Sequence, residues 1–222
     1  MFTGIVEAVG RLVERTPTSG GYRLRIGTAL APELREGDSI AVSGVCLTAV
    51  RVEADEFHAD VGPETARVTT LGWLAPGALV NLERSMRADS RFGGHFMQGH
   101  VDAVGHVEDL RPDAEFHWLT VGFPEALAAY IVQKGSIAVD GISLTVAGLG
   151  KDRFDIQVVP FTMDHTNLGR MHVGDRVNLE CDMVGKYVVR AIEVSGLNSQ
   201  LSTLKSQVAS RTERVSGTSD KR

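Results

Sequence analysis

Short segments in which apolar and polar residues alternate run through most of the chain. Tyr22, Leu24 and Ile26 are separated by polar residues, and Phe154, Ile156 and Val158 follow the same alternation. A period of two places successive side chains on opposite faces of an extended strand. Glycine, proline and aspartate punctuate these segments, so the pattern predicts several short β-strands with one brief helical candidate at 124–133.

The strand pattern occurs twice, because the sequence contains an internal repeat. Gly4–Gly10 recurs as Gly99–Gly105, Ser39–Thr48 recurs as Ser136–Thr145, and the order of the matches is kept. The copies are 95 residues apart at their start and 97 residues apart from Ser39 onward. Several short strands in each copy favour a small closed barrel, which leaves no exposed sheet edge. A single large sandwich would not explain the duplication.

The repeat divides most of the chain into two domains, 1–94 and 95–185, joined through Arg87–Gly94. After Lys186 the pattern changes to one with apolar residues at helical spacing. We therefore expect an oligomerisation helix over 186–215 and a polar, disordered tail over 216–222.

The apolar side of this expected helix consists of Leu197, Leu201, Leu204 and Val208, and Gly196 is a position where the helix could be interrupted. An amphipathic helix at the end of two barrels needs a cover for its apolar side. Self-association is the simplest cover, and packing on the chain's own barrels is the alternative.

Composition narrows the class of protein. Among 222 residues, 43% are hydrophobic and 23% are charged, as in ordinary globular proteins. The formal net charge of -5 disfavours nucleic acid as a partner. The chain has no apolar run long enough for a membrane helix and no signal peptide at Met1–Gly4, so we expect a cytoplasmic protein in which Cys46 and Cys181 are thiols.

The common nucleotide-binding and hydrolase motifs are missing from the sequence. It has no G-x-G-x-x-G after a strand, no P-loop and no nucleophile elbow, which disfavours nicotinamide and ATP chemistry. His95 and His100 lie five residues apart in a strand-like stretch, which points their side chains to opposite faces. We therefore predict no metal site.

The strongest local signal is a loop that occurs in both copies, Ser43–Thr48 and Asp140–Thr145. Its glycine allows close approach of a flat ligand, and the following small polar side chains offer hydrogen bonds to a heterocycle. A purely structural role, with glycine for a turn and threonine for a strand, is the alternative.

The two copies differ at positions that could carry chemistry. Ser143 stands where the first copy has Cys46, His100 replaces Ile5, and Asp182 replaces Ser85. A thiol, an imidazole, a hydroxyl and a carboxylate are suitable for proton transfer and nucleophilic addition. The repeat thus predicts two similar pockets with different reactive groups. We interpret Cys181 as a small buried apolar residue without a chemical role.

The sequence resembles the riboflavin synthase family, whose members contain two lumazine-binding repeats and a C-terminal helix. The resemblance covers about residues 1–195 and rests on Met1–Val6, Gly44–Thr48, Gly93–Val101 and Lys134–Thr145. It implies a mainly β fold: two six-stranded Greek-key barrels in tandem, followed by an α-helix.

The resemblance further implies a homotrimer in which each active site lies between the N-terminal barrel of one chain and the C-terminal barrel of a neighbour. Two 6,7-dimethyl-8-ribityllumazine molecules would react there to give riboflavin and 5-amino-6-ribitylaminouracil, without a cofactor. The resemblance leaves open an association with lumazine synthase.

Carried over to this chain, the resemblance assigns catalytic roles to Cys46, His100, Ser143 and Asp182. His100 would lie nearest to the methyl carbon of the lumazine that gives up a proton. Ser143 and Asp182 would position or activate a nucleophile, and Cys46 would act on the opposing molecule. The implied N-terminal pocket residues are Gly4, Ile5, Val6, Cys46, Leu47, Thr48, Asp60, Val61, Gly62, Pro63, Glu64 and Thr65. The implied C-terminal pocket residues are Gly99, His100, Val101, Lys134, Ser143, Leu144, Thr145, Gln157, Val158, Val159, Pro160, Phe161 and Thr162.

Two other functions are compatible with the same pair of barrels. A non-catalytic protein that binds lumazine or flavin, such as a light-antenna lumazine protein, could dispense with the reactive groups. A structural scaffold would need no polar loop in either copy.

Overall fold

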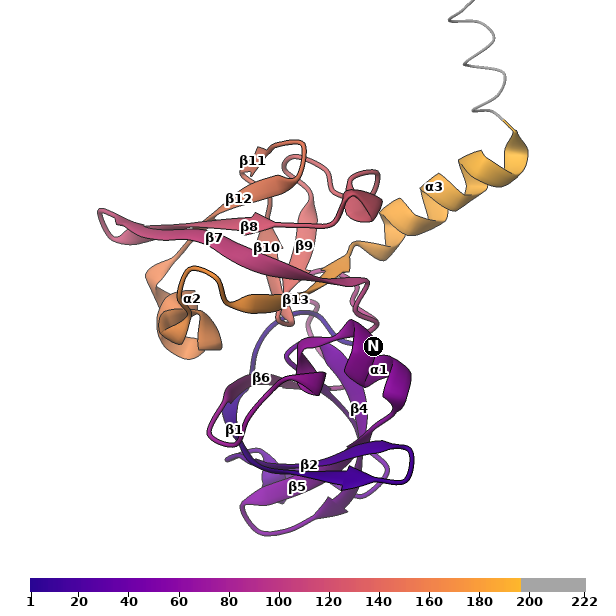
Figure 1. Cartoon of the computed structure of the whole chain (residues 1–222), viewed down its shortest axis with the longest axis vertical. Coiled ribbons are helices and arrows are strands. Elements are labelled where there is room, and N and C mark those ends of the chain that lie inside the picture. The colour runs from indigo at the N-terminus through magenta and orange to yellow at the C-terminus, as the bar shows by residue number, and fades with distance from the viewer. Residues whose placement is uncertain (197–222) are drawn as a thin grey trace, which may run out of the picture. The chain divides into compact units, whose positions relative to one another are not determined.

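The computed structural model describes residues 1–196 and contains two compact units, one formed by Met1–Met183 and one that begins at Val184 (Figure 1). The first unit holds both repeats and all of the described strands. No helix among the described residues is long and apolar enough to cross a membrane.

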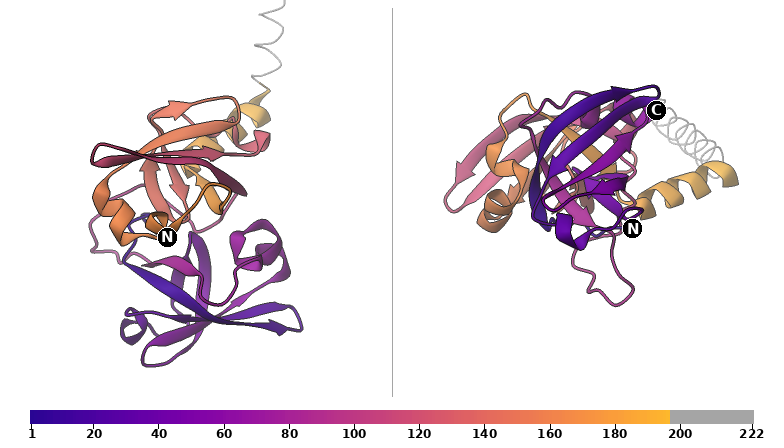
Figure 2. Two further views of the ribbon diagram at one scale, coloured as in Figure 1. Left: turned by 60° about the vertical axis from the view of Figure 1, so that its left-hand side comes forward. Right: turned by 90° about the horizontal axis from the view of Figure 1, so that it is seen from below.

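The first repeat forms a closed six-stranded barrel, as the resemblance implies (Figure 2). Hydrogen bonding joins the strands in the order β1-β2-β5-β4-β3-β6, and β6 pairs with β1 to close the circle. The strands are β1 (Ala8–Thr18), β2 (Gly21–Gly27), β3 (Ser39–Val42), β4 (Val45–Val52), β5 (Glu56–Val61) and β6 (Leu79–Arg84).

The second repeat forms a curled sheet with the corresponding strand order, β10-β9-β13-β7-β8-β12-β11. Its strands are β7 (Ala103–Asp113), β8 (Phe116–Gly122), β9 (Ser136–Val139), β10 (Ile142–Thr145), β11 (Gly148–Leu149), β12 (Arg153–Val158) and β13 (Arg176–Cys181). The sheet therefore has seven strands, where the resemblance implies six.

The extra strand arises from one bend that both copies share. In the first barrel the Ala49 N–H donates to the Asp38 carbonyl, and β4 absorbs the bend as a register shift between Ala49 and Arg51. In the second copy the Val146 N–H donates to the Gly135 carbonyl, and the ladder breaks there into β10 and β11. A bulge and a strand break are thus two outcomes of the same turn of the backbone.

Alternation of apolar residues explains the two cores. In β2, Leu24 and Ile26 are buried while Arg25 between them is not, and in β12 Phe154, Ile156 and Val158 are all buried. Each set packs inside its own barrel. The alternation therefore predicted correctly which faces of these strands point inward.

The predicted helix at 124–133 is wrong for most of its length, because only Glu125–Leu127 forms a single 3-10 turn. Two short helices that the sequence analysis missed follow equivalent strands, α1 (Pro63–Val68) after β5 and α2 (Pro160–His165) after β12. Each has a proline in its first turn, where the missing N–H costs no hydrogen bond.

The C-terminal helix α3 runs over Met183–Ser195, so it begins at Met183 rather than at Lys186. Gly196 has φ +69, a left-handed conformation that commonly ends a helix. The apolar positions from Leu197 to Val208 and the tail 216–222 lie outside the described residues.

Reciprocal hydrogen bonds join the two barrels. The Asn81 side-chain amide donates to the Asp140 carbonyl at 2.9 Å, and the equivalent Asn178 donates to the Ser43 carbonyl at 2.8 Å. Between these pairs, the turns of Gly44 and Gly141 lie back to back, because a Cβ added to Gly44 would be 2.8 Å from the Gly141 nitrogen. The barrels are thus related by a local pseudo-twofold axis.

The segment before each barrel crosses to the other barrel. Val6, which precedes β1, packs against the core of the second barrel, and Val101, which precedes β7, packs against the core of the first. Phe2 and Met97 pair where these two crossing segments, Thr3–Val6 and Gln98–Val101, run past each other. Residues from both repeats therefore meet at two equivalent places.

Candidate functional site

The first of these places surrounds Cys46 on β4. The Cys46 N–H donates to the Gly99 carbonyl at 2.8 Å. Gly99 has φ +77, and a Cβ added there would be 2.5 Å from the Cβ of Cys46, so only glycine fits. His100 follows at once and is exposed, while Cys46 is half-buried. We call this group the Cys46 half-site.

The second place surrounds Ser143 on β10 and repeats the same contacts. The Ser143 N–H donates to the Gly4 carbonyl at 2.8 Å. Gly4 has φ +78, and an added Cβ would be 2.6 Å from the Cβ of Ser143. Ile5 is exposed where the Cys46 half-site has His100. We call this group the Ser143 half-site.

This arrangement corrects the expected grouping of the loops. The resemblance implies that Gly4–Val6 lies with Cys46 and that Gly99–Val101 lies with Ser143. The structure exchanges them, because each crossing segment leaves its own repeat before it reaches its barrel. No periodicity in the sequence marks such a crossing, since the crossing segments are not strands of either barrel.

Two buried glutamates, which the sequence analysis did not assign, hold the crossing segments. Glu83 on β6 accepts hydrogen bonds from the Thr3 and Gly4 N–H groups at 2.7 and 2.9 Å. Glu180 on β13 accepts from the Gln98 and Gly99 N–H groups at 2.7 and 3.0 Å. The available signal was their place in a repeated Val-Asn-Leu-Glu sequence, at 80–83 and 177–180.

Burial explains how Glu83 behaves as an acid. Burial of the carboxyl group away from water raises the pKa of Glu83, and the hydrogen bonds from Thr3 and Gly4 lower it. A buried carboxylate that accepts from backbone N–H groups fixes the position of the segment that donates.

The Ser143 half-site contains a histidine that the sequence analysis considered only as a metal ligand. His95 is buried, and its Nδ1 lies 2.7 Å from the Ser143 hydroxyl. Burial lowers the pKa of His95, and the charge of Asp182 partly opposes this shift. A neutral imidazole can accept the serine proton, and a nearby carboxylate stabilises the imidazolium that results.

The two half-sites therefore differ in chemistry while they share a scaffold. The Cys46 half-site offers a thiol and the imidazole of His100. The Ser143 half-site offers a hydroxyl, the imidazole of His95 and the field of Asp182. At the offset of 95 positions Met1 aligns with Phe96, so His95 lies just outside the aligned copies. Among the described residues no hydrogen bond joins Cys46 to Ser143.

The other assigned residues of the first barrel cluster where β5 runs into α1. Asp60 forms an ion pair with Arg23 at 2.7 Å, which lowers the pKa of Asp60. Glu64 pairs with Arg67 on the same helix, and Thr65 accepts the Thr69 hydroxyl at its carbonyl. Both carboxylates thus already have cationic partners.

The equivalent junction of β12 and α2 presents apolar and aromatic surface. Val159 is half exposed, and Phe161 is 68% exposed and stacks on His165 with ring centroids 3.9 Å apart. An exposed aromatic face of this kind is suited to contact with a planar heterocycle. Phe161 and Glu64 occupy equivalent positions of the repeat, so an aromatic ring stands in the second barrel where the first has a carboxylate.

Three polar residues assigned to the pockets are exposed near the bend that both barrels share. Thr48 and Thr145 occupy equivalent positions on β4 and β10. Lys134 has φ +66, and its N–H donates to the Val146 carbonyl. The side chain of Lys134 is therefore presented from a tight turn beside β10.

One group of residues, Glu53, Glu56 and His58, brings three ligand atoms within 4.8 Å of one another. Arg51 pairs with Glu53 at 2.8 Å and Arg25 pairs with Glu56 at 3.1 Å, so both carboxylates are already neutralised. This group lies on β5 and its preceding turn, and it gives no reason to assign a metal.

Comparison with known proteins matches both repeats to one family. The lumazine binding domain matches residues 3–85 and 98–182. Riboflavin synthase of Mycobacterium tuberculosis (strain H37Rv) is 48% identical over 201 residues, which cover 88% of this chain and 100% of the relative. Riboflavin synthase of Bacillus subtilis is 38% identical over 205 residues, which cover 92% and 95%.

Solved structures agree in fold. The crystal structure of LumP complexed with riboflavin is similar with a TM-score of 0.77 and 25% identity, over 82% of this chain and 99% of that one. The structure of LumP complexed with 6,7-dimethyl-8-(1'-D-ribityl) lumazine has a TM-score of 0.74 at 24% identity, with the same coverage. With its two matched lumazine-binding domains and its identity to these enzymes over most of its length, the chain belongs to the riboflavin synthase family.

Proposed function

We propose that this enzyme transfers a four-carbon unit between two molecules of 6,7-dimethyl-8-ribityllumazine, giving riboflavin and 5-amino-6-ribitylaminouracil. The observation that carries the proposal is the pair of half-sites built on one scaffold with different reactive groups. Two identical substrates that must play different roles need two similar pockets of unequal chemistry. Because one molecule gives what the other gains, the reaction requires no external oxidant or reductant.

In the proposed mechanism the Ser143 half-site holds the molecule that gives up its four carbons. Neutral His95 accepts the hydrogen of the Ser143 hydroxyl at Nδ1, which makes this oxygen, or a water that it orients, nucleophilic toward the lumazine ring. Asp182 stabilises the positive charge that His95 acquires. Phe161 offers its exposed face to the ring.

The Cys46 half-site holds the molecule that receives the four carbons. His100 is exposed and follows Gly99, which contacts Cys46, and it is the proposed acceptor of a proton from the acidic methyl group of the lumazine. The Cys46 thiol acts on the ring of the same molecule. Gly99 brings the backbone that precedes His100 against Cys46.

We propose that a complete active site pairs the Cys46 half-site of one chain with the Ser143 half-site of a neighbour in a homotrimer. Helix α3 supports this assembly, because Tyr187, Val188 and Val194 are exposed apolar side chains, and Tyr187 and Val194 lie two helical turns apart. Such a stripe is stable in water only when another surface covers it.

Substitutions on the apolar side of α3 test whether this helix holds the trimer together. Replacement of Val188 and Val194 by glutamate should convert the trimer to smaller species in analytical ultracentrifugation, whereas Arg190→Glu on the same helix should not. A double variant that remains trimeric would show that α3 does not hold the assembly.

Turnover is tested by incubating the purified chain with the ribityllumazine alone. We expect riboflavin to accumulate, with one molecule formed for every two lumazines consumed. The competing function is a protein that binds lumazine without conversion. Saturable binding with no riboflavin formed would favour that function and end the enzyme proposal.

The residue roles are tested by single substitutions. Ser143→Ala, His95→Gln, Cys46→Ala and His100→Gln should lower kcat by more than about tenfold while they change substrate binding much less, because they remove groups used in the transition state. Ser90→Ala, His106→Gln and Cys181→Ala are matched controls outside both half-sites. Normal kcat in a test variant would remove that residue from the mechanism.

Two further proposals concern the setting of the enzyme. A reactive thiol at Cys46 requires a reducing compartment, and we propose the cytoplasm. Association with lumazine synthase stays a prediction from the resemblance, to be tested by co-sedimentation of the two enzymes.

A further inference from the structure

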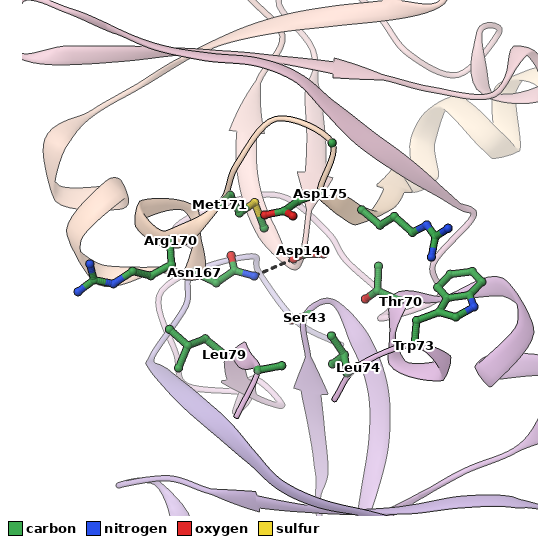
Figure 3. Close-up of a pocket in the computed structure, with 13 residues that line it drawn as sticks. Ser43, Thr70, Trp73, Leu74, Leu79, Asp140, Asn167, Arg170, Met171 and Asp175 are labelled. Atoms are coloured by element: carbon green, nitrogen blue, oxygen red, sulfur yellow. Dashed lines mark hydrogen bonds between the residues drawn. The ribbon is translucent and has the colours of Figure 1, made fainter. Parts of the chain in front are cut away.

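A cavity of about 540 Å³ lies where the two barrels meet (Figure 3). None of the five residues with a proposed chemical role, Cys46, His95, His100, Ser143 and Asp182, lines it. Its lining residues come from both repeats: Ser43, Thr70, Trp73, Leu74, Ala78 and Leu79 from the first, and Asp140, Asn167, Arg170, Met171, Gly174, Asp175 and Arg176 from the second.

The lining follows the pseudo-twofold axis. Each of the six residues from the first repeat has its counterpart, 97 positions later, among the residues from the second. Figure 3 shows Trp73 and Arg170, one such pair, at opposite ends of the cavity. The cavity therefore lies across the axis and would present two identical walls if the repeats were identical.

The two walls instead have opposite character. Trp73, Leu74, Ala78 and Leu79 make the wall of the first repeat apolar. Their counterparts in the second repeat are Arg170, Met171, Asp175 and Arg176, so three of four positions have gained a charge. A cavity with one apolar wall and one charged wall suits a ligand that is itself divided in this way.

The arginines and the aspartates of this wall do not pair with each other in the part of the chain that the structure describes. Asp175 accepts a hydrogen bond from the His172 N–H at 2.8 Å, and Asp140 accepts from the Asn178 N–H and the Asn167 side chain at 2.7 Å each. Neither arginine has a carboxylate partner within residues 1–196, and the Arg176 guanidinium stacks over the Trp73 ring, 4.6 Å from its centroid. The cations of the cavity are thus available to a ligand while its carboxylates are engaged.

We propose that this cavity binds a small aromatic anion, a ring that carries a carboxylate or another acidic group. The ring packs on Leu74, Leu79 and the Trp73 end of the cavity. The acidic group pairs with Arg170 or Arg176, whose planar guanidinium suits carboxylate and phosphate oxygens. Because the ligand contacts both repeats, its binding stabilises the contact between the barrels.

The experiment uses 2-naphthoate as the probe and the fluorescence of Trp73 as the readout. Trp73 and Trp118 are the two tryptophans, so Trp118→Phe isolates the signal of Trp73. We expect saturable quenching by 2-naphthoate. The neutral 2-naphthalenemethanol should bind at least about tenfold more weakly than 2-naphthoate. The full-length Arg170→Gln/Arg176→Gln variant should bind 2-naphthoate about tenfold more weakly.

Arg111→Gln/Arg153→Gln, which removes two exposed arginines away from the cavity, should leave binding unchanged. Excess riboflavin should not displace the probe, because it occupies the half-sites. Absence of quenching, equal affinity in the Arg170/Arg176 variant, or displacement by riboflavin would each overturn the proposal. If Trp118→Phe does not fold, titration calorimetry measures the affinity for 2-naphthoate of the unsubstituted enzyme and of the arginine variant instead.

Discussion

Gly4 and Gly99 show at the scale of single residues how the half-sites depend on the absence of a side chain. Both have left-handed φ values, and both lie against the backbone of the residue whose side chain is proposed to react. Conformation and contact therefore select glycine independently. A larger residue would have to move Cys46 or Ser143 away from the crossing segment.

Gly99→Ala should destabilise the fold by about 1–3 kcal/mol, because its Cβ would clash with Cys46 in a strained conformation. Urea unfolding measures the change. Gly20→Ala is the matched control, since no atom lies within 4 Å of its added Cβ, and it should change stability by less than about 0.5 kcal/mol. Equal stability of the two variants would contradict this account of the half-site.

Asp140 is the buried acid at the contact between the barrels, where the first repeat has Ser43. Burial raises the pKa of Asp140 to about 6. The folded protein therefore holds the proton more tightly than the unfolded chain, whose aspartate titrates near 4. The stabilisation from this group is complete below pH 4, is lost as the pH rises through 6, and does not change above that.

Asp140→Asn should remove this dependence. The difference in unfolding free energy, wild type minus variant, should fall by up to about 3 kcal/mol between pH 4 and pH 7. Unfolding in urea at a series of pH values measures it, with Asp152→Asn on the surface as a control. A difference that is constant with pH would contradict the assignment to Asp140.

At the scale of elements, the position of each half-site depends on a strand of one barrel and a segment that crosses from the other repeat. Glu83 and Glu180 connect the two, because each accepts two backbone N–H groups from the crossing segment. A glutamine in either position could accept through one oxygen only, and its amide would face an N–H donor.

Glu180→Gln should therefore lower kcat and destabilise the fold by about 1–3 kcal/mol, through displacement of Gly99 and His100. The two effects are separated by measuring kcat at a temperature at which the variant is fully folded by circular dichroism. Glu115→Gln in an exposed turn is the control. A folded Glu180→Gln enzyme with normal kcat would show that Glu180 stabilises the barrel without positioning the half-site.

The sequence predicted the elements whose residues follow a local period. The inward faces of β2 and β12 were correct, because alternation and burial coincide there. Helices α1 and α2 were missed because six residues are too few to show a helical period.

The catalytic candidates were predictable in part from the repeat. Aligned positions revealed Cys46 opposite Ser143, but His95 lies outside the aligned copies and pairs with Ser143 across 48 positions. The exchange of the crossing segments also had no local signal. Contacts between residues far apart in sequence depend on the path of the backbone, which periodicity does not encode.

At the scale of the whole molecule, the proposed active site requires two chains. Within one chain each half-site already combines both repeats, but it supplies only one set of reactive groups. A chain with a defect in one half-site still carries an intact copy of the other. Defects in different half-sites should therefore compensate for each other in a mixed assembly.

Cys46→Ala and Ser143→Ala enzymes should each be nearly inactive alone and regain activity after joint unfolding and refolding. With random mixing at equal concentration, about one quarter of the sites would combine an intact Cys46 with an intact Ser143. Riboflavin formation measures the recovery. Refolding each variant alone is the control, and a mixture as inactive as its components would place both half-sites of one reaction in the same chain.

The crossing segments also bear on how the chain could have arisen. A polypeptide with one repeat would leave its barrel without the valine that packs from outside, and its own leading segment without a barrel to enter. Two copies facing each other would meet both needs by exchanging these segments across a true twofold axis. Fusion of the genes would have preserved the exchange and freed the copies to diverge, so that the thiol of Cys46 and the hydroxyl of Ser143 could evolve separately.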